Sequence, residues 1–253
     1  MRLALRLGTA AVLALAASAL AAQPLSVAED WSDADYSTKE VRALTHAYAQ
    51  CVVRRHPAKA AQAIAANADN ATLLRDYRML IDDECLSRQV VDTTQMRFTG
   101  DLYRYALADA LVNRELAAQP VPALESVPKL EHRNPGPPPQ PVNEKGKKLG
   151  KRKLAAAQLS FNRDVAYAFL SHYGECVVRA DTAGAKALLV TKPDSAEETA
   201  RFTALRPAFS QCLPAGRTLR FGKVALRGSV AINYYRLADA ARASAAAVPA
   251  GKS

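Results

Sequence analysis

The chain has 253 residues, a formal charge of +10 at pH 7, 49% hydrophobic residues and only 6% aromatic residues. The length suits two domains of ordinary size. Alanine dominates the hydrophobic residues and glycine is scarce, which favours an all-α fold over a β fold. No stretch after the first 22 residues is apolar enough to span a bilayer, which excludes a membrane protein with several spans.

Residues 1–21 have the features of a cleaved signal peptide. Arg2 and Arg6 give a positive start, an apolar run extends from Leu7 to Leu20, and the sequence ALA at 19–21 is a small-x-small cleavage motif. The run of about 14 residues is short for a membrane span of roughly 20 residues. A retained N-terminal anchor is the alternative. Cleavage predicts a periplasmic or secreted protein with membrane contact that is at most peripheral.

An internal repeat organises the rest of the chain. The sequence YAQCVVR at 48–54 recurs as YGECVVR at 173–179, and YALADA at 105–110 recurs as YRLADA at 235–240. A second cysteine follows the first in each half, at Cys85 and Cys212. Agreement in the same order over most of each half predicts a duplicated module. We expect copy 1 at 36–118, after a lead at 22–35, and copy 2 at 154–247, before a disordered tail at 248–253.

The repeat predicts how the four cysteines pair. A duplicated module should repeat its own cross-link, so we expect disulfides Cys51–Cys85 and Cys176–Cys212 in an oxidising compartment. Closing a loop of about 35 residues contributes roughly 3–4 kcal/mol in the chain-entropy model. Zinc sites and redox sites favour C-x-x-C pairs, which the sequence lacks. Each first cysteine falls on the expected buried stripe of its helix.

Helical spacing predicts about four helices in copy 1, over roughly 37–54, 57–66, 70–85 and 101–118. Ser37 and Glu40 form a capping box at the first helix. Pro57 suits the first position of the second helix, with His56 as its cap. Gly100 precedes the last helix. The predicted fold is therefore all-α, with two similar disulfide-closed small helical bundles.

Residues 119–153 differ in composition from both modules. Eight prolines fall between 120 and 141, and a basic run follows. Proline-rich polar sequence buries little apolar area, so we expect a disordered, extended linker. The basic run is a candidate polyanion-binding segment for lipid headgroups or cell-wall polymers, with a solvated tether as the alternative and nucleic acid not expected. Its residues are Lys145, Lys147, Lys148, Lys151, Arg152 and Lys153.

Copy 2 repeats the helical pattern, with expected helices over about 161–179, 182–190, 196–212 and 229–247. Asp181 is the expected cap of the second of these helices, and Ser195 with Glu198 forms a capping box at the third. Pro207 should break or kink the third helix. Gly228 precedes the last one. Residues 218–221 are expected to be a short strand or an extended loop.

The chain contains none of the common catalytic, haem, phosphate-binding or dinucleotide-binding motifs. His46 and His172 differ by one position in the repeat, which does not favour a shared ligand role. The acidic run at 82–84 is expected to be a solvated helix face, because consecutive helix positions point in different directions. We therefore predict no catalytic, cofactor-binding or metal-binding residues.

Four repeated charged residues suggest one structural pair in each module: Arg54 with Asp109, and Arg179 with Asp239. An anion-binding arginine in a groove is the functional alternative. Tyr105 and Tyr235 are expected to be core residues whose hydroxyls reach the edge.

The pattern YxxCVVR, the second cysteine and the glycine-led Y-x-LADA helix together resemble uncharacterised secreted bacterial proteins with a duplicated two-cysteine helical module. The resemblance covers both halves and implies no activity and no site. The sequence predicts a non-catalytic exported protein, with no cofactor, that binds or scaffolds at the cell envelope. The alternatives are an envelope protein that docks on polyanions through the basic linker, and an enzyme of unrecognised type. The partner could be an envelope polyanion or another envelope protein.

Overall fold

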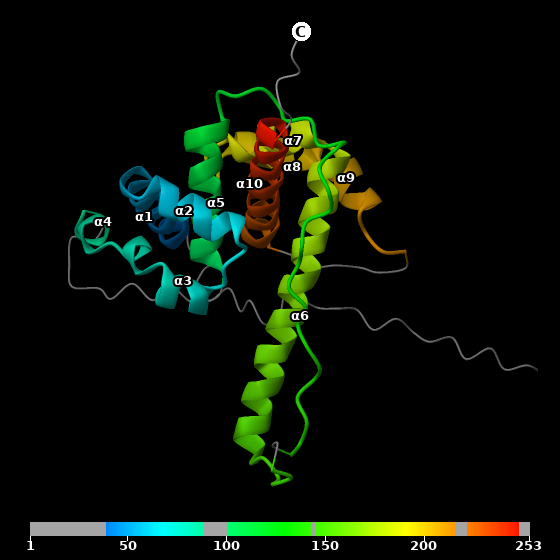
Figure 1. Ribbon diagram of the computed structural model, residues 1–253. Coiled ribbons are helices and arrows are strands. Elements are labelled where there is room, and N and C mark those ends of the chain that lie inside the picture. Colours follow the sequence, from blue (N-terminus) through cyan, green and yellow to red (C-terminus); the bar gives the residue numbers. More distant parts are fainter. Residues whose placement is uncertain (1–38, 89–100, 143–144, 216–221, 248–253) are drawn as a thin grey trace, which may run out of the picture.

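The computed structural model describes residues 39–88, 101–142, 145–215 and 222–247 (Figure 1). The predicted signal peptide at 1–21, the lead at 22–35 and the tail at 248–253 lie outside these residues. So do Ser37, Gly100 and the segment 218–221. Within the described residues the fold is all-α, as predicted, and the one strand-like pairing is a bridge between Val142 and Lys148.

The helices of the first half are short, and the last of them ends in a π-helical turn. They are α1(Lys39–Arg55), α2(Pro57–Ala65), α3(Asn70–Asp76), the 3-10 turn η2(Arg78–Leu80), α4(Asp83–Ser87), α5(Leu102–Leu111) and η3(Val112–Leu116). The second half contains two long helices. Its elements are α6(Lys151–Ala180), α7(Thr182–Leu189), α8(Ala196–Ala204), α9(Arg206–Gln211) and α10(Lys223–Ala247).

Helices α5 and α10 pack against each other at the centre of the molecule. Helix α1 covers α5 from one side, and α6 covers α10 from the other. Leu107 and Leu111 of α5 and Tyr234 and Leu237 of α10 are buried in one continuous hydrophobic cluster. The two halves therefore share a core instead of forming separate bundles on a tether.

Several helix contacts of the first half have a parallel in the second half. Helix α1 contacts α2, α4 and α5, and helix α6 contacts α7, α9 and α10. Helix α2 packs on α5 as α7 packs on α10. This common order of contacts follows the common order of the sequence motifs.

Both predicted disulfides are present. Cys51–Cys85 joins α1 to α4 with a Cα–Cα distance of 5.6 Å, and Cys176–Cys212 joins α6 to the end of α9 at 5.8 Å. Cys51 and Cys85 are fully buried, but Cys176 is exposed, so its expected place on a buried stripe is wrong. The buried face of α6 is instead made by neighbours such as Gly174 and Val177.

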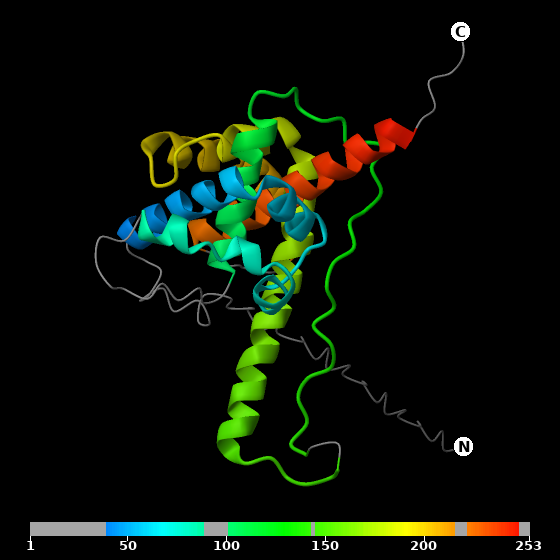
Figure 2. The same cartoon turned by 60° about the vertical axis from the view of Figure 1, so that its left-hand side comes forward.

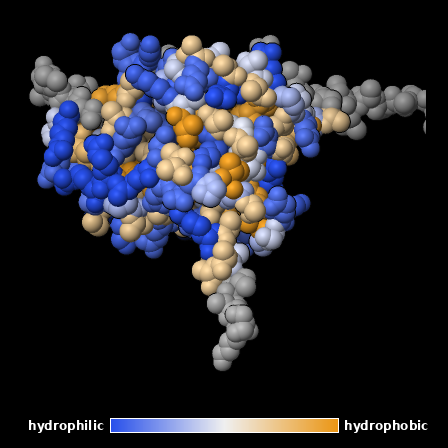
Figure 3. Space-filling view, turned by 90° about the horizontal axis from the view of Figure 1, so that it is seen from above, coloured by the Kyte–Doolittle hydropathy of each residue, from blue (hydrophilic) through white to orange (hydrophobic). Residues whose placement is uncertain are grey.

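Two disulfides indicate an oxidising compartment outside the cytoplasm. Among the helices of the described ranges, none combines the length and the apolar character that a membrane crossing requires. The face seen from above is mostly polar and carries only separate apolar patches (Figure 3).

Side-chain caps set several helix starts. Asp181 accepts a hydrogen bond from the Gly184 amide at 2.7 Å, and Ser195 accepts one from the Glu198 amide at 3.0 Å, as expected. His56 precedes Pro57 but makes no side-chain cap, and Asp69 caps α3. The break expected at Pro207 is found, since α8 ends at Ala204 and a new helix starts at Arg206.

The last helix starts earlier than the glycine predicts. Helix α10 begins at Lys223, so Gly228 lies inside it. A Cβ atom at Gly228 would overlap with the ring of Tyr105 on α5. Gly228 is therefore required because α5 and α10 approach each other closely here, and the predicted start at 229 is wrong.

The predicted disordered linker is corrected by the structure. Residues 119–133, which we call the strap, form an irregular segment that turns at 125–126 and then runs beside α6, with Leu124 and Val127 buried (Figure 2). Arg179 of α6 donates to the carbonyl oxygens of Leu124, Val127 and Pro128 at 2.7–3.1 Å. The prediction counted only apolar area, whereas the strap is also held through its backbone carbonyls.

The basic end of the predicted linker is helical, because α6 starts at Lys151. The first half of α6 projects from the body, and the preceding chain runs back along it (Figures 1 and 2). We call residues 145–164 the arm. The loop at its tip is closed by the Leu149 amide, which donates to the Pro141 carbonyl at 2.8 Å.

Replacement of Gly228 by alanine should destabilise the protein by about 1–3 kcal/mol, because the added methyl group has no space beside Tyr105. Urea unfolding of the oxidised protein measures this change. The control is Gly150→Ala, where no atom lies within 4 Å of the new methyl group. Equal stability of Gly228→Ala and the wild type would contradict the close packing of α5 on α10.

Candidate functional site

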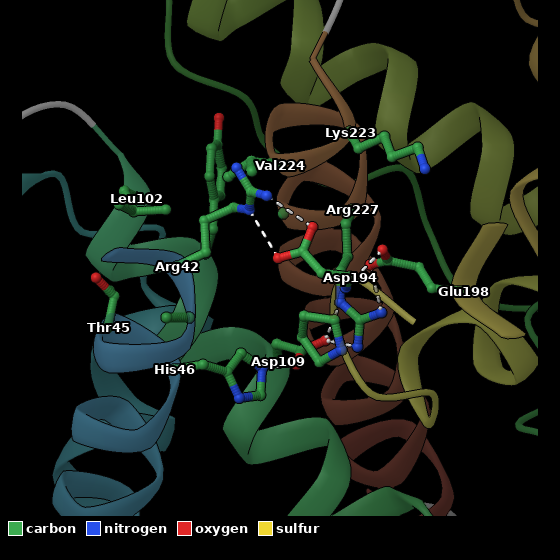
Figure 4. Close-up of a pocket in the computed structure, with 14 residues that line it drawn as sticks. Arg42, Thr45, His46, Leu102, Asp109, Asp194, Glu198, Lys223, Val224 and Arg227 are labelled. Carbon is green, nitrogen blue, oxygen red and sulfur yellow. Dashed lines mark hydrogen bonds and ion pairs between the residues drawn. The ribbon is translucent and has the colours of Figure 1, made fainter. Parts of the chain in front are cut away.

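A pocket lies where the first and second halves meet (Figure 4). Its walls come from α1, α5, the turn before α8, and the start of α10. Leu102, Tyr105 and Val224 provide apolar wall. The charged residues that line the pocket are Arg42, His46, Asp109, Asp194, Glu198, Lys223 and Arg227.

Arg227 of α10 forms the floor of this pocket and is almost fully buried. Its guanidinium binds the carboxylates of Asp109 on α5, at 2.8 Å, and Glu198 on α8, at 3.0 Å. It also donates to the carbonyl oxygens of Leu188, Leu189 and Thr191 at the end of α7, at 2.9–3.1 Å. One side chain therefore joins α5, α7, α8 and α10.

Asp109 has a second partner, the Nε2 atom of His46 on α1. The imidazole, the carboxylate and the Arg227 guanidinium thus form a chain of polar contacts from α1 through α5 to α10. His46 is mostly buried, with 17% of its side chain exposed. The predicted partly exposed position is approximately right, but the ion-pair partner was not predicted.

The rim of the pocket contains a second ion pair between the halves. Arg42 of α1 binds both carboxylate oxygens of Asp194, at 2.8 and 2.9 Å. Asp194 has a left-handed backbone φ of +61°, and its amide donates to Glu198 at 2.9 Å. Figure 4 shows Arg42 and Asp194 facing each other across the mouth. Lys223 lies nearby and donates to Thr199 at 3.0 Å.

The polar side chains of this pocket are mostly engaged in ion pairs with one another. An aspartate–histidine pair is one part of a general-base arrangement, which also needs a nucleophile within hydrogen-bond reach of the imidazole. The hydroxyl group that α1 contributes, that of Thr45, donates to the Val41 carbonyl instead. Asp109 is also shared with Arg227. The ion pairs of the pocket join the two halves of the chain.

The predicted structural pairs are wrong in their partners. Arg54 is exposed to solvent. Asp109 is buried and binds Arg227 and His46 instead. The reason is helical phase: Tyr48, Ala49 and Val52 make the buried stripe of α1, and Arg54 lies on the opposite, solvent-exposed side of this helix.

Arg179 and Asp239 also have other partners than each other. Arg179 binds Glu175 at 2.8 Å, four residues earlier on α6, and Asp239 binds Arg242 at 3.1 Å. The arginine–carboxylate chemistry was correctly expected at Arg179, but its partner is local. Tyr105 and Tyr235 are core residues as expected, and the Tyr235 hydroxyl reaches Glu115 at 2.8 Å.

The acidic run at 82–84 is only partly the solvated face that was expected. Asp82 is buried and caps α4 by accepting from the Cys85 amide at 3.1 Å. It also binds Arg55 at 2.7 Å and His56 at 2.9 Å. Burial would raise the pKa of Asp82, but the hydrogen bonds from Cys85, His56 and Arg55 outweigh it and lower the pKa to about 2.

The strap is fixed to α6 by a second polar group. His132 binds Ser171 at 2.7 Å and Glu175 at 2.6 Å, and its ring lies 4.0 Å from that of His172. Burial lowers the pKa of His132. Glu175 also accepts from the Leu130 amide at 3.1 Å. These contacts explain why the segment before 134 follows α6.

The six basic residues of the predicted polyanion-binding segment gather at the tip of the arm, and all are exposed. Five of them, at 147, 148 and 151–153, line one shallow hollow between the loop and the first turn of α6. Val142 and Leu159 of the same region expose about 41% of their surface. The basic residues thus lie at the end of the arm that Figure 2 shows projecting from the body, and Leu159 lies about two helical turns nearer to it.

Comparison with known proteins adds no relative to this geometry: no family model, curated protein or solved structure matches the chain.

Replacement of Arg227 by methionine should cost about 3–5 kcal/mol of stability, because Asp109 and Glu198 would remain buried without their cation. Urea unfolding measures the loss. Arg201→Met is the matched control, since Arg201 lies on α8 with 47% of its side chain exposed. A loss below about 1 kcal/mol would contradict the role given to Arg227.

Asp82→Asn should destabilise the protein by about 1–3 kcal/mol at pH 7, since the charged cap loses its ion pairs. A carboxylate whose pKa is lower in the folded state contributes stability above its unfolded pKa near 4, and this is lost as the pH falls towards 2. The difference between wild type and variant should therefore shrink between pH 5 and pH 2. Thermal unfolding across this range tests it, with the exposed neighbour Asp83→Asn as the control.

Proposed function

We propose that this is a non-catalytic exported protein that acts by binding at the cell envelope, where its arm docks on an anionic surface. The single observation that carries the proposal is the placement of six exposed basic residues at the tip of a projecting helix. The oxidising compartment that the disulfides indicate is consistent with an envelope location.

The arm geometry suits a broad, flat anionic surface. Because α6 is one continuous helix from Lys151 into the core, the arm is supported by the body at one end and free at the other. A membrane or polymer layer can reach all of the tip charges without touching the body. Each lysine or arginine near an anionic lipid surface contributes about 1 kcal/mol, and exposed apolar side chains such as Leu159 can add to this.

We also propose that the two halves descend from one duplicated helical module. The matched cysteine pairs and the matched contacts of α1 with α6, α2 with α7 and α5 with α10 support this. In the described residues α1 has 17 residues and α6 has 30, and the positions that would match the arm come before Lys39, outside the described residues.

Replacement of the six tip residues by glutamine should weaken binding to vesicles that contain phosphatidylglycerol by at least about tenfold at 0.1 M salt, since several charge contacts are lost. Flotation with anionic and with neutral vesicles measures this binding. The same experiment is repeated with anionic cell-wall fragments in place of vesicles. The six substitutions are at Lys145, Lys147, Lys148, Lys151, Arg152 and Lys153.

The control removes the same charge from exposed positions of the body and should retain most of the binding. It carries glutamine at Arg54, Lys59, Arg88, Arg114, Lys192 and Arg206. Equal loss in both variants would show a general charge effect, and unchanged binding of the tip variant would contradict the proposed docking surface.

A further inference from the structure

A buried group of polar residues lies between α5, α6, α10 and the strap, away from the interface pocket. We call Asn67, Arg104, Tyr167 and Arg236 the polar seam. All four are more than nine-tenths buried. The first three are joined directly: Arg104 donates to the Tyr167 hydroxyl at 2.7 Å and to Asn67 Oδ1 at 3.1 Å. The Arg104 guanidinium also lies over the Tyr167 ring.

Arg236 belongs to the same seam. Tyr167 and Arg104 both act electrostatically on its charge, and burial lowers its pKa. Its Nη2 atom donates to the Glu131 carbonyl of the strap at 2.8 Å. Its Nε and Nη1 atoms are buried and have no hydrogen-bond partner among the described residues.

The unpartnered donors of the seam are not limited to Arg236. Arg104 Nε and Asn67 Nδ2 are likewise buried without a partner in the described part of the chain. Three side chains of the seam therefore present four buried nitrogen donors that lack acceptors among the described residues. Buried donors cost about 1–3 kcal/mol each when they are unsatisfied, and more when they are charged.

The charges of the seam are also unbalanced. Asp101 pairs with Arg104 at 2.7 Å, and Glu175 is shared between Arg179 and His132. Within the described ranges, Arg236 has no carboxylate at ion-pair distance. The seam thus lacks one negative charge at Arg236 and acceptors for four nitrogen atoms, and a bound anion supplies both.

From this we infer that the polar seam binds a small monovalent inorganic anion of the size of chloride, with Arg236 as its main ligand and Arg104 and Asn67 beside it. The size follows from the packing: the surrounding side chains are buried, and the strap covers Arg236 through the carbonyl of Glu131. The anion would stabilise the contact of the strap with α6 and α10. This site is independent of the proposed docking by the arm.

The test compares thermal unfolding in sodium chloride and in sodium gluconate at equal ionic strength and pH 7. Gluconate is too large for the seam, so chloride should raise the Tm of the oxidised protein by about 2–6 °C at 0.2 M. Arg236→Gln should abolish this difference. Arg242→Gln, the same change on the same helix at an exposed arginine, should retain it. An equal Tm in the two salts, as expected if water satisfies the donors, would overturn the inference.

A second variant decides the question if Arg236→Gln does not fold. Asn67→Asp places a carboxylate within reach of Arg104, and aspartate tolerates the left-handed φ of +51° at this position. The Tm of this variant should be the same in chloride and in gluconate, because the new carboxylate takes the place of the bound anion. Crystals soaked in bromide should show an anomalous peak next to the Arg236 guanidinium. A chloride effect that persists in both variants, or bromide found only elsewhere, would contradict the assignment.

Discussion

The structure depends on one buried arginine between the two halves. Arg227 has enough donors to bind two carboxylates and three backbone carbonyls at once, and these partners come from α5, α7 and α8. The planar guanidinium makes this possible, whereas the ammonium of lysine has only three donors. Because a buried carboxylate is stable only with a partner, Asp109 and Glu198 fix the position of Arg227 as strictly as it fixes theirs.

The same principle explains the strap. A proline-rich segment has few amide donors, so its carbonyl oxygens must find donors elsewhere if they are shielded from water. Arg179 supplies three of these donors, and His132 with Glu175 fixes the far end. An arginine on a regular helix therefore supplies the hydrogen-bond donors that an irregular segment lacks. The polar seam extends this arrangement to Arg236, whose donors exceed the acceptors that the described residues provide.

The two halves differ in structure although their sequence motifs agree. The first half has a fully buried disulfide and short helices, while the second exposes Cys176 and extends α6 beyond the core. The shared helices α5 and α10 pack closely because Gly228 leaves space for the Tyr105 ring. The rest of α6 is then free to project and to present its basic tip. A compact core and an exposed arm are thus combined in one chain.

The sequence by itself determined the all-α class, the pairing of Cys51 with Cys85 and of Cys176 with Cys212, and several helix starts such as Ser195. These features depend on local spacing and on the repeat, which are readable from residue order. Only the tertiary structure decided the partners of the charged residues. The spacing of residues around Arg227 gave no signal for its partner in the other half of the chain. Its partner Asp109 is 118 residues away, and such a contact arises only when α5 and α10 pack together.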